Sequence, residues 1–340
     1  MVQKADLDWP NLEFGYMETD YNVRCVWKDG QWSRPELSDD FNLTMSAAAT
    51  CLHYGQEAFE GLKVFTNPEG RAQVFRIEEN ARRMVASAEK ILMQPVPEEL
   101  FVECVYRCVQ ANLRFVPPHG SGASLYVRPL LIGTGPQVGV KPADEYLFLV
   151  LVMPVGPYFK TGFKPVDLIV EEEIDRAAPL GVGDVKVGGN YAAGMRASKK
   201  AKAAGYTEVL YLDAREKKFI DESGPANFFA ITANGQYVTP ESQSILPSIT
   251  NMSLIELARD MGLNPQRRPV DIEEIFSFKE VGCCGTAAVI TPVGSITYRE
   301  RKAVYCPDGE AGAHCTALYN KLRAIQLGEE PDPLGWVRTV

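Results

Sequence analysis

The sequence predicts a mixed α+β fold that is divided into two domains. Its 340 residues exceed the usual size of one domain. Hairpin-like strands and helices follow one another without a regular βαβ order, which favours α+β. Composition changes at residues 155–165, where prolines and glycines replace helix formers. We therefore expect a small N-terminal α/β domain at 1–156, a linker at 157–166 and a larger domain at 167–340.

The N-terminal part reads as two hairpins, two helices and two long strands. Asp29-Gly30 is a strong hairpin turn, and Asn67–Gly70 is a second turn between apolar segments. Residues 78–92 and 98–113 show helical periodicity. In the second helix, apolar residues recur at the spacing of one stripe, which predicts that two of its thiols are buried. The strands are expected at residues 23–27 with 31–32, 62–65 with 72–75, 124–132 and 146–153.

The C-terminal part alternates strands and helices around a glycine-rich loop. The loop covers residues 181–189 and precedes a predicted helix at 191–204. A further helix should start after Thr250, whose hydroxyl makes it a good N-cap. The remaining elements are expected as strands at 166–171, 208–212, 228–232 and within 285–296, and as a closing helix at 311–327.

Charge and composition exclude several classes of protein. The net charge is −9, without the basic clusters that nucleic-acid phosphates require. Eight cysteines lie scattered along the chain with no CxxC pair, which favours free thiols in a reducing cytoplasm. The three histidines are widely separated, so no metal site is expected. The longest apolar run, residues 146–153, is far shorter than the roughly 20 residues that span a bilayer, and the first residues lack the layout of a signal peptide.

The first candidate for chemistry is Lys186. It lies among the glycines of Gly181–Tyr191, a segment that fits neither a dinucleotide fingerprint nor a P-loop. A lysine packed among other groups can have its pKa lowered until a free amine is present, as covalent catalysis with an aldehyde requires. A loop with an incidental lysine is the plain alternative.

Four further segments carry weaker signals. Asp221-Glu222 places carboxylates at a strand edge, residues 246–251 lead into a helix whose amides could bind an anion, and Gly285–Ala288 is a small-residue turn of the same kind. Arg83 follows Arg82 on a helix, so one of the two can point inward. Alone, each reads as an ordinary turn, capped helix or solvated arginine. Together they supply what a phosphorylated pyridine aldehyde needs: an amine, an acid at the ring nitrogen and donors for a phosphate.

Six motifs in this order closely resemble the branched-chain amino-acid aminotransferases, which are fold-type IV pyridoxal-phosphate enzymes. The resemblance runs from about Leu12 to Lys321. The motifs are Leu52–Lys63, Tyr126–Pro129, Lys186–Tyr191, Glu222–Gly224 with Asn227–Phe229, Leu246–Ile249, and Gly285–Ala287. The resemblance implies the fold of that family, a small α/β domain plus a larger domain with a β-barrel-like core.

The resemblance also implies roles for individual residues. Lys186 would form the Schiff base with pyridoxal 5′-phosphate and shuttle the proton. Tyr191 would bind the ring hydroxyl and Glu222 the ring nitrogen. The phosphate ligands would be Arg83, Ile249, Thr250 and Thr286. The substrate would meet Tyr54 and the Thr286-Ala287 turn with its α-carboxylate, Arg128 with a distal carboxylate, and an apolar pocket of Phe14, Phe59, Tyr126, Val140 and Tyr158.

The implied reaction is transamination of L-leucine, L-isoleucine and L-valine with 2-oxoglutarate, by a homodimer in the cytoplasm. Two departures stand out: Ala288 and Thr291 replace the redox CxxC of mammalian members, and Pro225 stands where relatives often have Thr. Two alternatives stay open. One is a D-amino-acid aminotransferase or aminodeoxychorismate lyase of the same fold. The other is a binding protein or synthase without the cofactor.

Overall fold

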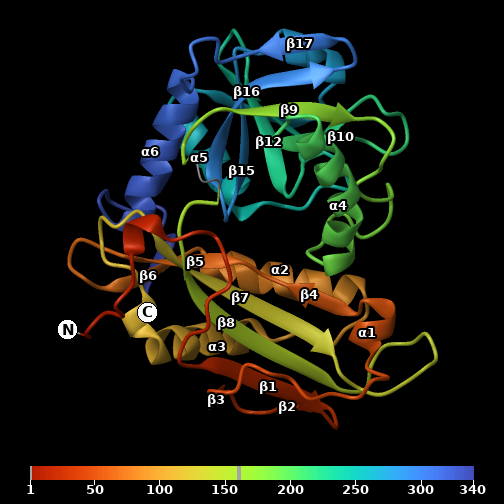
Figure 1. Cartoon of the computed structure of the whole chain (residues 1–340), viewed down its shortest axis with the longest axis vertical. Helices are drawn as coiled ribbons and strands as arrows, with labels where there is room; N and C mark the ends of the chain where they lie inside the picture. The colour runs from red at the N-terminus through yellow and green to blue at the C-terminus, as the bar shows by residue number, and fades with distance from the viewer. Residues whose placement is uncertain (1, 159–161) are drawn as a thin grey trace. The chain divides into compact units, whose positions relative to one another are not determined.

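The computed structural model describes residues 2–158 and 162–340, which form two compact units (Figure 1). Unit 1 contains the described residues up to Tyr158 together with Val185–Gly188 and Ala324–Val340. Unit 2 contains residues 162–184 together with Gly189–Arg323. The expected domain boundaries stay predictions, and residues 159–161 of the expected linker lie outside the described residues.

Unit 1 is built on one nine-stranded sheet. The strand order is β18-β6-β5-β7-β8-β1-β2, with β3 paired to β1 and β4 paired to β7. The strands are β1 Asn22–Lys28, β2 Gln31–Trp32, β3 Glu36–Ser38, β4 Glu57–Phe59, β5 Leu62–Thr66, β6 Ala72–Phe75, β7 Ser124–Gly133, β8 Tyr146–Val155 and β18 Val337–Thr339. The helices are η1 Trp9–Asn11, α1 Thr50–Tyr54, α2 Ile77–Lys90, α3 Glu98–Ala111 and η2 Leu113–Phe115.

The local signals of the sequence produce the expected hairpins. Asp29 and Gly30 both have positive φ, +52° and +82°, and Lys28 pairs directly with Gln31, as a two-residue turn of this kind requires. The second hairpin joins β5 and β6, also as predicted.

Helices α2 and α3 lie together along the sheet (Figure 1). The predicted apolar stripe of α3 is confirmed, because Phe101, Cys104, Val105 and Cys108 are all fully buried. Arg82 and Arg83 divide as expected: the Arg82 side chain is 51% exposed and that of Arg83 only 11%.

Unit 2 contains a closed barrel of six strands. Strand pairing runs β11-β10-β9-β16-β15-β12, and β12 pairs back to β11 to close the ring. Strands β13 and β14 extend from β12, and β17 pairs with β16. The strands are β9 Val166–Glu171, β10 Glu208–Leu212, β11 Ile220–Ser223, β12 Ala226–Ile231, β13 Gln236–Pro240, β14 Asn264–Arg268, β15 Glu280–Gly285, β16 Val289–Tyr298 and β17 Arg301–Val304. The predicted barrel-like core of the larger domain is therefore present.

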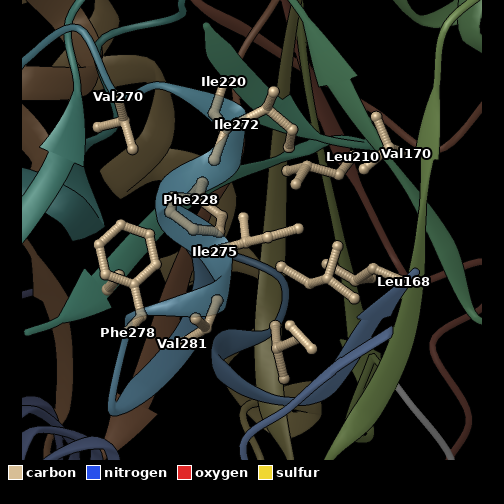
Figure 2. Close-up of a cluster of buried hydrophobic side chains, with 14 of the residues drawn as sticks. Leu168, Val170, Leu210, Ile220, Phe228, Val270, Ile272, Ile275, Phe278 and Val281 are labelled. Carbon is tan, nitrogen blue, oxygen red and sulfur yellow. The ribbon is translucent and has the colours of Figure 1, made fainter. Parts of the chain in front are cut away.

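All six barrel strands contribute to one apolar cluster, which also contains residues of η3, Ile272–Phe276 (Figure 2). Leu168, Leu210 and Phe228 come from three different strands, and Ile275 from η3 packs among them. The opposite face of β10 packs through Val209 and Tyr211 against another element, α4. This alternation along β10 is the period-two pattern of a strand buried on both faces.

The remaining helices are α4 Gly188–Ala203, α5 Ile249–Asp260 and α6 Ala313–Leu327. The predicted N-cap of α5 at Thr250 is wrong. The helix already begins at Ile249, and Ser248 is the cap, because its Oγ accepts the amide N–H of Asn251 at 3.2 Å. Both residue types are good caps, and the chain turns into the helix one residue after the serine.

Among the described residues, no helix combines the length and apolar character needed to cross a membrane.

Candidate active site

The backbone of Lys186 is held on both sides within unit 1. Its carbonyl oxygen accepts the N–H of Phe59 at 3.0 Å, and its own N–H donates to Ser87 Oγ at 3.0 Å. At Gly188, a Cβ atom would lie only 1.8 Å from Glu57 Oε1, and the Gly188 N–H donates to that carboxylate. The segment therefore passes tightly between β4 and α2.

The amine of Lys186 is poorly solvated. Its pKa is lowered from 10.5 to about 8: burial is the largest cause and the neighbouring Arg83 and Arg128 add to it, whereas Glu60 and Tyr126 act in the opposite direction. The Nζ atom lies 4.7 Å from the centre of the Phe59 ring. An amine with such a pKa is uncharged in about half of the molecules at pH 8, which satisfies the first requirement for a nucleophilic lysine.

Arg83 reaches toward this amine from α2 and is paired with Glu60. The Arg83 Nε and Nη2 atoms donate to the two carboxylate oxygens of Glu60 at 2.6 and 2.9 Å. Burial alone would raise the pKa of Glu60, but Arg83, Lys186 and Asn80 bring it below its usual value. Glu60 is therefore a buried carboxylate beside the candidate lysine.

Aromatic side chains and one arginine form a group near Lys186. Phe14 contacts the rings of Tyr126 and Tyr158 edge to face, each at 5.2 Å between ring centres. The Arg128 guanidinium carbon lies 4.8 Å from the Phe59 ring centre, and its Nη2 donates to the Tyr126 hydroxyl at 3.2 Å. Its Nε is buried and lacks a hydrogen-bond partner among the described atoms, so this arginine retains the capacity to bind an anion.

Two other predicted pocket residues lie on exposed segments of unit 1. Val140 is 85% exposed and Tyr54 is 42% exposed. The Tyr54 hydroxyl donates to the carbonyl of Val138, two residues from Val140. Their exposure sets them apart from Tyr126, which is only 6% exposed.

In unit 2, Glu222 is held as a buried acid on β11. It is 3% exposed, and its Oε1 accepts the N–H of Leu246 at 2.5 Å. The Nη2 atom of Arg176, itself buried, lies 3.4 Å from the same oxygen and also donates to the carbonyl of Gly183 at 2.9 Å. A carboxylate fixed in this way is suited to hold a positive charge on a ring nitrogen.

The anion-binding candidates of unit 2 lie at two turns. Ile249 and Thr250 are the first two residues of α5 and are buried; amides at a helix start attract anions. Thr286 and Ala287 lie in the turn that joins β15 to β16. Tyr191 is in the first turn of α4, next to Asn190, whose Nδ2 donates to the Val182 carbonyl at 2.7 Å and so closes the glycine-rich loop.

Sequence reasoning assigned no role to Glu60, Ser87 or Arg176. Glu60 lies inside a quoted motif, but a glutamate next to a short strand usually faces solvent. One signal in the sequence could have indicated a buried acid here. Asn80 and Arg83 are three residues apart on α2, so both can donate to the same carboxylate.

Each unit, taken by itself, carries residue types that pyridoxal 5′-phosphate requires. Unit 1 has an amine of lowered pKa and an arginine, and unit 2 has a fixed carboxylate and two sets of turn amides. The described residues contain no group of three or more histidine, cysteine or acidic side chains that could hold a metal ion. An amine, a carboxylate and anion-binding amides are the groups that an aldehyde-bearing phosphate ester requires.

Comparison with known proteins identifies the family. The family described as amino-transferase class IV matches residues 57–296. The branched-chain-amino-acid aminotransferase of Haemophilus influenzae is 45% identical over 338 residues, which cover 98% of each chain. The crystal structure of the Escherichia coli branched-chain amino acid aminotransferase superposes with a TM-score of 0.78 at 27% identity and covers 94% of this chain and 99% of that one.

A third similar structure is that of the T.th. branched-chain amino acid aminotransferase with pyridoxamine 5′-phosphate. Its TM-score is 0.75 at 26% identity, with 93% of this chain and 98% of that chain covered. The predicted fold class and cofactor agree with these findings. The chain belongs to the branched-chain amino-acid aminotransferases, which are class IV aminotransferases of the fold-type IV pyridoxal-phosphate enzymes.

Proposed function

We propose that this enzyme transfers the amino group of L-leucine, L-isoleucine or L-valine to 2-oxoglutarate, reversibly and in two half-reactions. The observation that carries the proposal is the group around Lys186. An amine with a pKa of about 8 lies beside aromatic side chains and beside Arg128, whose buried Nε lacks a described partner. Such a group of side chains suits both an apolar side chain and the distal carboxylate of glutamate.

When bound, pyridoxal phosphate supplies an aldehyde for amines and a protonated ring that withdraws electrons from the substrate Cα. Arg83, Ile249, Thr250 and Thr286 would hold its phosphate. Tyr191 would donate to the ring hydroxyl, and Glu222 would keep the ring nitrogen protonated. The Leu246 amide and Arg176 hold the Glu222 carboxylate in place for this role.

Lys186 moves the proton in this proposal. An acid–base group works best when its pKa is close to the working pH, and burial brings the pKa of Lys186 to about 8. Its backbone is fixed by hydrogen bonds to Phe59 and Ser87, and its Nζ lies 4.7 Å from the centre of the Phe59 ring. The amine would therefore carry a proton between the substrate Cα and the aldehyde carbon of the cofactor.

Substrate selection follows from the character of the pocket. Phe14, Phe59, Tyr126, Tyr158 and Val140 would enclose the branched side chain. An apolar wall separates side chains by only about 1–3 kcal/mol per methylene, so all three branched amino acids should react. Arg128 would bind the γ-carboxylate of glutamate. Tyr54 and the amides of Thr286-Ala287 would hold the α-carboxylate.

We also propose that the enzyme is a cytoplasmic homodimer. All eight cysteines are free thiols, which suits a reducing compartment. The exposed apolar side chains Leu52, Val138 and Val140 give one end of unit 1 a surface that a second copy could cover. Light scattering on the purified enzyme measures its mass, and a monomer at micromolar concentration would contradict this part.

The test of the reaction is a panel of amino donors with 2-oxoglutarate, together with the absorption spectrum. We expect a yellow protein that borohydride bleaches, activity with the three L-amino acids, and loss of turnover in Lys186→Ala. Turnover of D-amino acids instead would indicate a D-amino-acid aminotransferase, and release of pyruvate from aminodeoxychorismate would indicate the lyase. A protein that stays colourless with added pyridoxal phosphate would refute the assignment.

A further inference from the structure

We propose that Glu60 is a positioning residue of the active site, which fixes the Arg83 guanidinium and balances its charge beside the Lys186 amine. The inference rests on the proposed roles of Arg83 and Lys186 and adds a residue to which the motif analysis gave no function.

Glu60 is held by hydrogen bonds to four residues. The Glu60 side chain is 0% exposed. Its oxygens accept from Arg83 Nε at 2.6 Å and Nη2 at 2.9 Å, from Asn80 Nδ2 at 2.7 Å and from the Gly61 N–H at 3.1 Å. Its own N–H donates to the Pro129 carbonyl at 2.8 Å. Backbone and side chain are therefore both fixed, so the carboxylate can act as a rigid support.

The Glu60 carboxylate binds Arg83, the arginine that would hold the cofactor phosphate. Two parallel N–H···O bonds define the plane of a guanidinium as well as its position. Arg83 projects from the middle of α2, and without a partner its long side chain would sample several rotamers. Glu60 removes that freedom before the cofactor arrives, so cofactor binding loses less entropy.

The same carboxylate sets the charge near Lys186. The charged and titratable groups that face the amine within unit 1 are Arg83 on α2, Tyr126 and Arg128 on β7, and Glu60 after β4. Arg83 lowers the pKa of Lys186, and Glu60 raises it. Since the two are paired, their effects oppose each other, and removing one or the other should move the pKa of the amine in opposite directions.

A purely structural ion pair would behave differently. A pair that only stabilises the fold, too far from the amine to act on its charge, would change the stability of the enzyme when broken but would not shift the pKa of Lys186 in opposite directions. The decisive readout is therefore the pH dependence of Lys186 in four proteins: wild type, Glu60→Gln, Arg83→Gln and the double variant, compared as a cycle.

The experiment uses full-length enzyme from which the cofactor has been removed. The rate of condensation with added pyridoxal phosphate is followed by absorbance from pH 6 to 10, and the dissociation constant is measured at pH 7.5. Glu79→Gln is the matched control, because Glu79 also accepts from two arginines, Arg76 just before α2 and Arg82 within it, at 3.2 and 2.7 Å. Melting temperatures verify that each variant is folded.

For Glu60→Gln we expect a dissociation constant at least about tenfold higher, because an amide cannot accept both donors of the guanidinium. The pH midpoint of condensation should fall by about one unit or more, as is typical when a nearby opposite charge is lost. It should rise in Arg83→Gln and return near the wild-type value in the double variant. Glu79→Gln should change neither quantity.

If Glu60→Gln does not fold, the comparison of Arg83→Gln with the double variant still decides. The double variant replaces a buried charged pair by two amides, and its midpoint should lie below that of Arg83→Gln. Equal midpoints in the folded variants, or an unchanged dissociation constant in Glu60→Gln, would overturn the inference. Failure of the wild type to bind pyridoxal phosphate would instead refute the proposed function.

Discussion

Gly61 lies where the chain leaves Glu60, and its lack of a side chain makes room for Tyr126. A Cβ atom at this position would be 2.2 Å from the Tyr126 hydroxyl oxygen and 3.0 Å from its Cζ. Non-bonded carbon contacts are most favourable at roughly 3.5 Å, so the ring tip must move by about 1 Å in Gly61→Ala. Overpacking of this kind costs roughly 1–3 kcal/mol.

The displacement should also reach substrate binding. The Tyr126 hydroxyl accepts from Arg128 Nη2, and the ring packs against Phe14. Moving the hydroxyl therefore moves the arginine that we expect to bind the distal carboxylate of glutamate. In Gly61→Ala the KM for glutamate should rise by about tenfold, and by more than the KM for leucine.

The assay combines thermal unfolding with steady-state kinetics. Gly189→Ala is the stability control, since a Cβ there meets no atom within 4 Å and alanine favours a helix. The double variant Gly61→Ala with Tyr126→Phe lacks the closest oxygen and should regain part of the lost stability. A melting temperature of Gly61→Ala within a degree of wild type, with unchanged KM values, would refute the reasoning.

Three further predictions concern unit 2. In Gly282→Ala, a Cβ would meet the Phe229 ring at 2.4 Å, so the free energy of unfolding in urea should fall by about 1–3 kcal/mol; a value equal to wild type would contradict this. Ser248→Ala removes the N-cap of α5 and should cost about 1 kcal/mol in the same assay, with Ser248→Asp retaining most of the stability. Burial alone would raise the pKa of Glu280, but the amides at the start of α6 and His314 lower it below 4.5. The carboxylate therefore stabilises the fold above about pH 4.5 and loses this effect as pH falls through the lowered pKa. Glu280→Gln should destabilise at pH 7 by about 1–3 kcal/mol, and the difference from wild type should shrink in melts recorded toward pH 3; a constant difference would show that charge is not involved.

The elements with strong local signals could be predicted from the sequence. The Asp29-Gly30 turn, the apolar stripe of α3 and the continuous apolar run of β8 each specify their structure locally. Short strands could not be found in this way. Strand β4, Glu57–Phe59, has three residues, too few for a period to be recognised, and its pairing with β7 is a long-range contact.

The residues of the candidate site also differ in whether a local signal in the sequence marks them. Lys186 was identified from its glycine-rich surroundings and from family resemblance, and Arg83 from a choice between two neighbours on a helix. The burial of Glu60 and Arg176 depends on partners far away in the chain, such as Arg83 for the first and Ser244 for the second. Ionised side chains are usually exposed, so nothing local marks either residue as an exception.

The four residues Val185–Gly188 belong to unit 1, although their neighbours on both sides in the chain belong to unit 2. During synthesis, the sheet of unit 1 can therefore assemble most of its strands before Lys186, the proposed nucleophile, has been translated. A fragment that ends before Val185 would carry Arg83 and Arg128 but would lack Lys186, the proposed Schiff-base lysine. If a second fragment that contains Lys186 restored the reaction with pyridoxal phosphate, this would show that Val185–Gly188 can dock on unit 1 without a covalent connection to it.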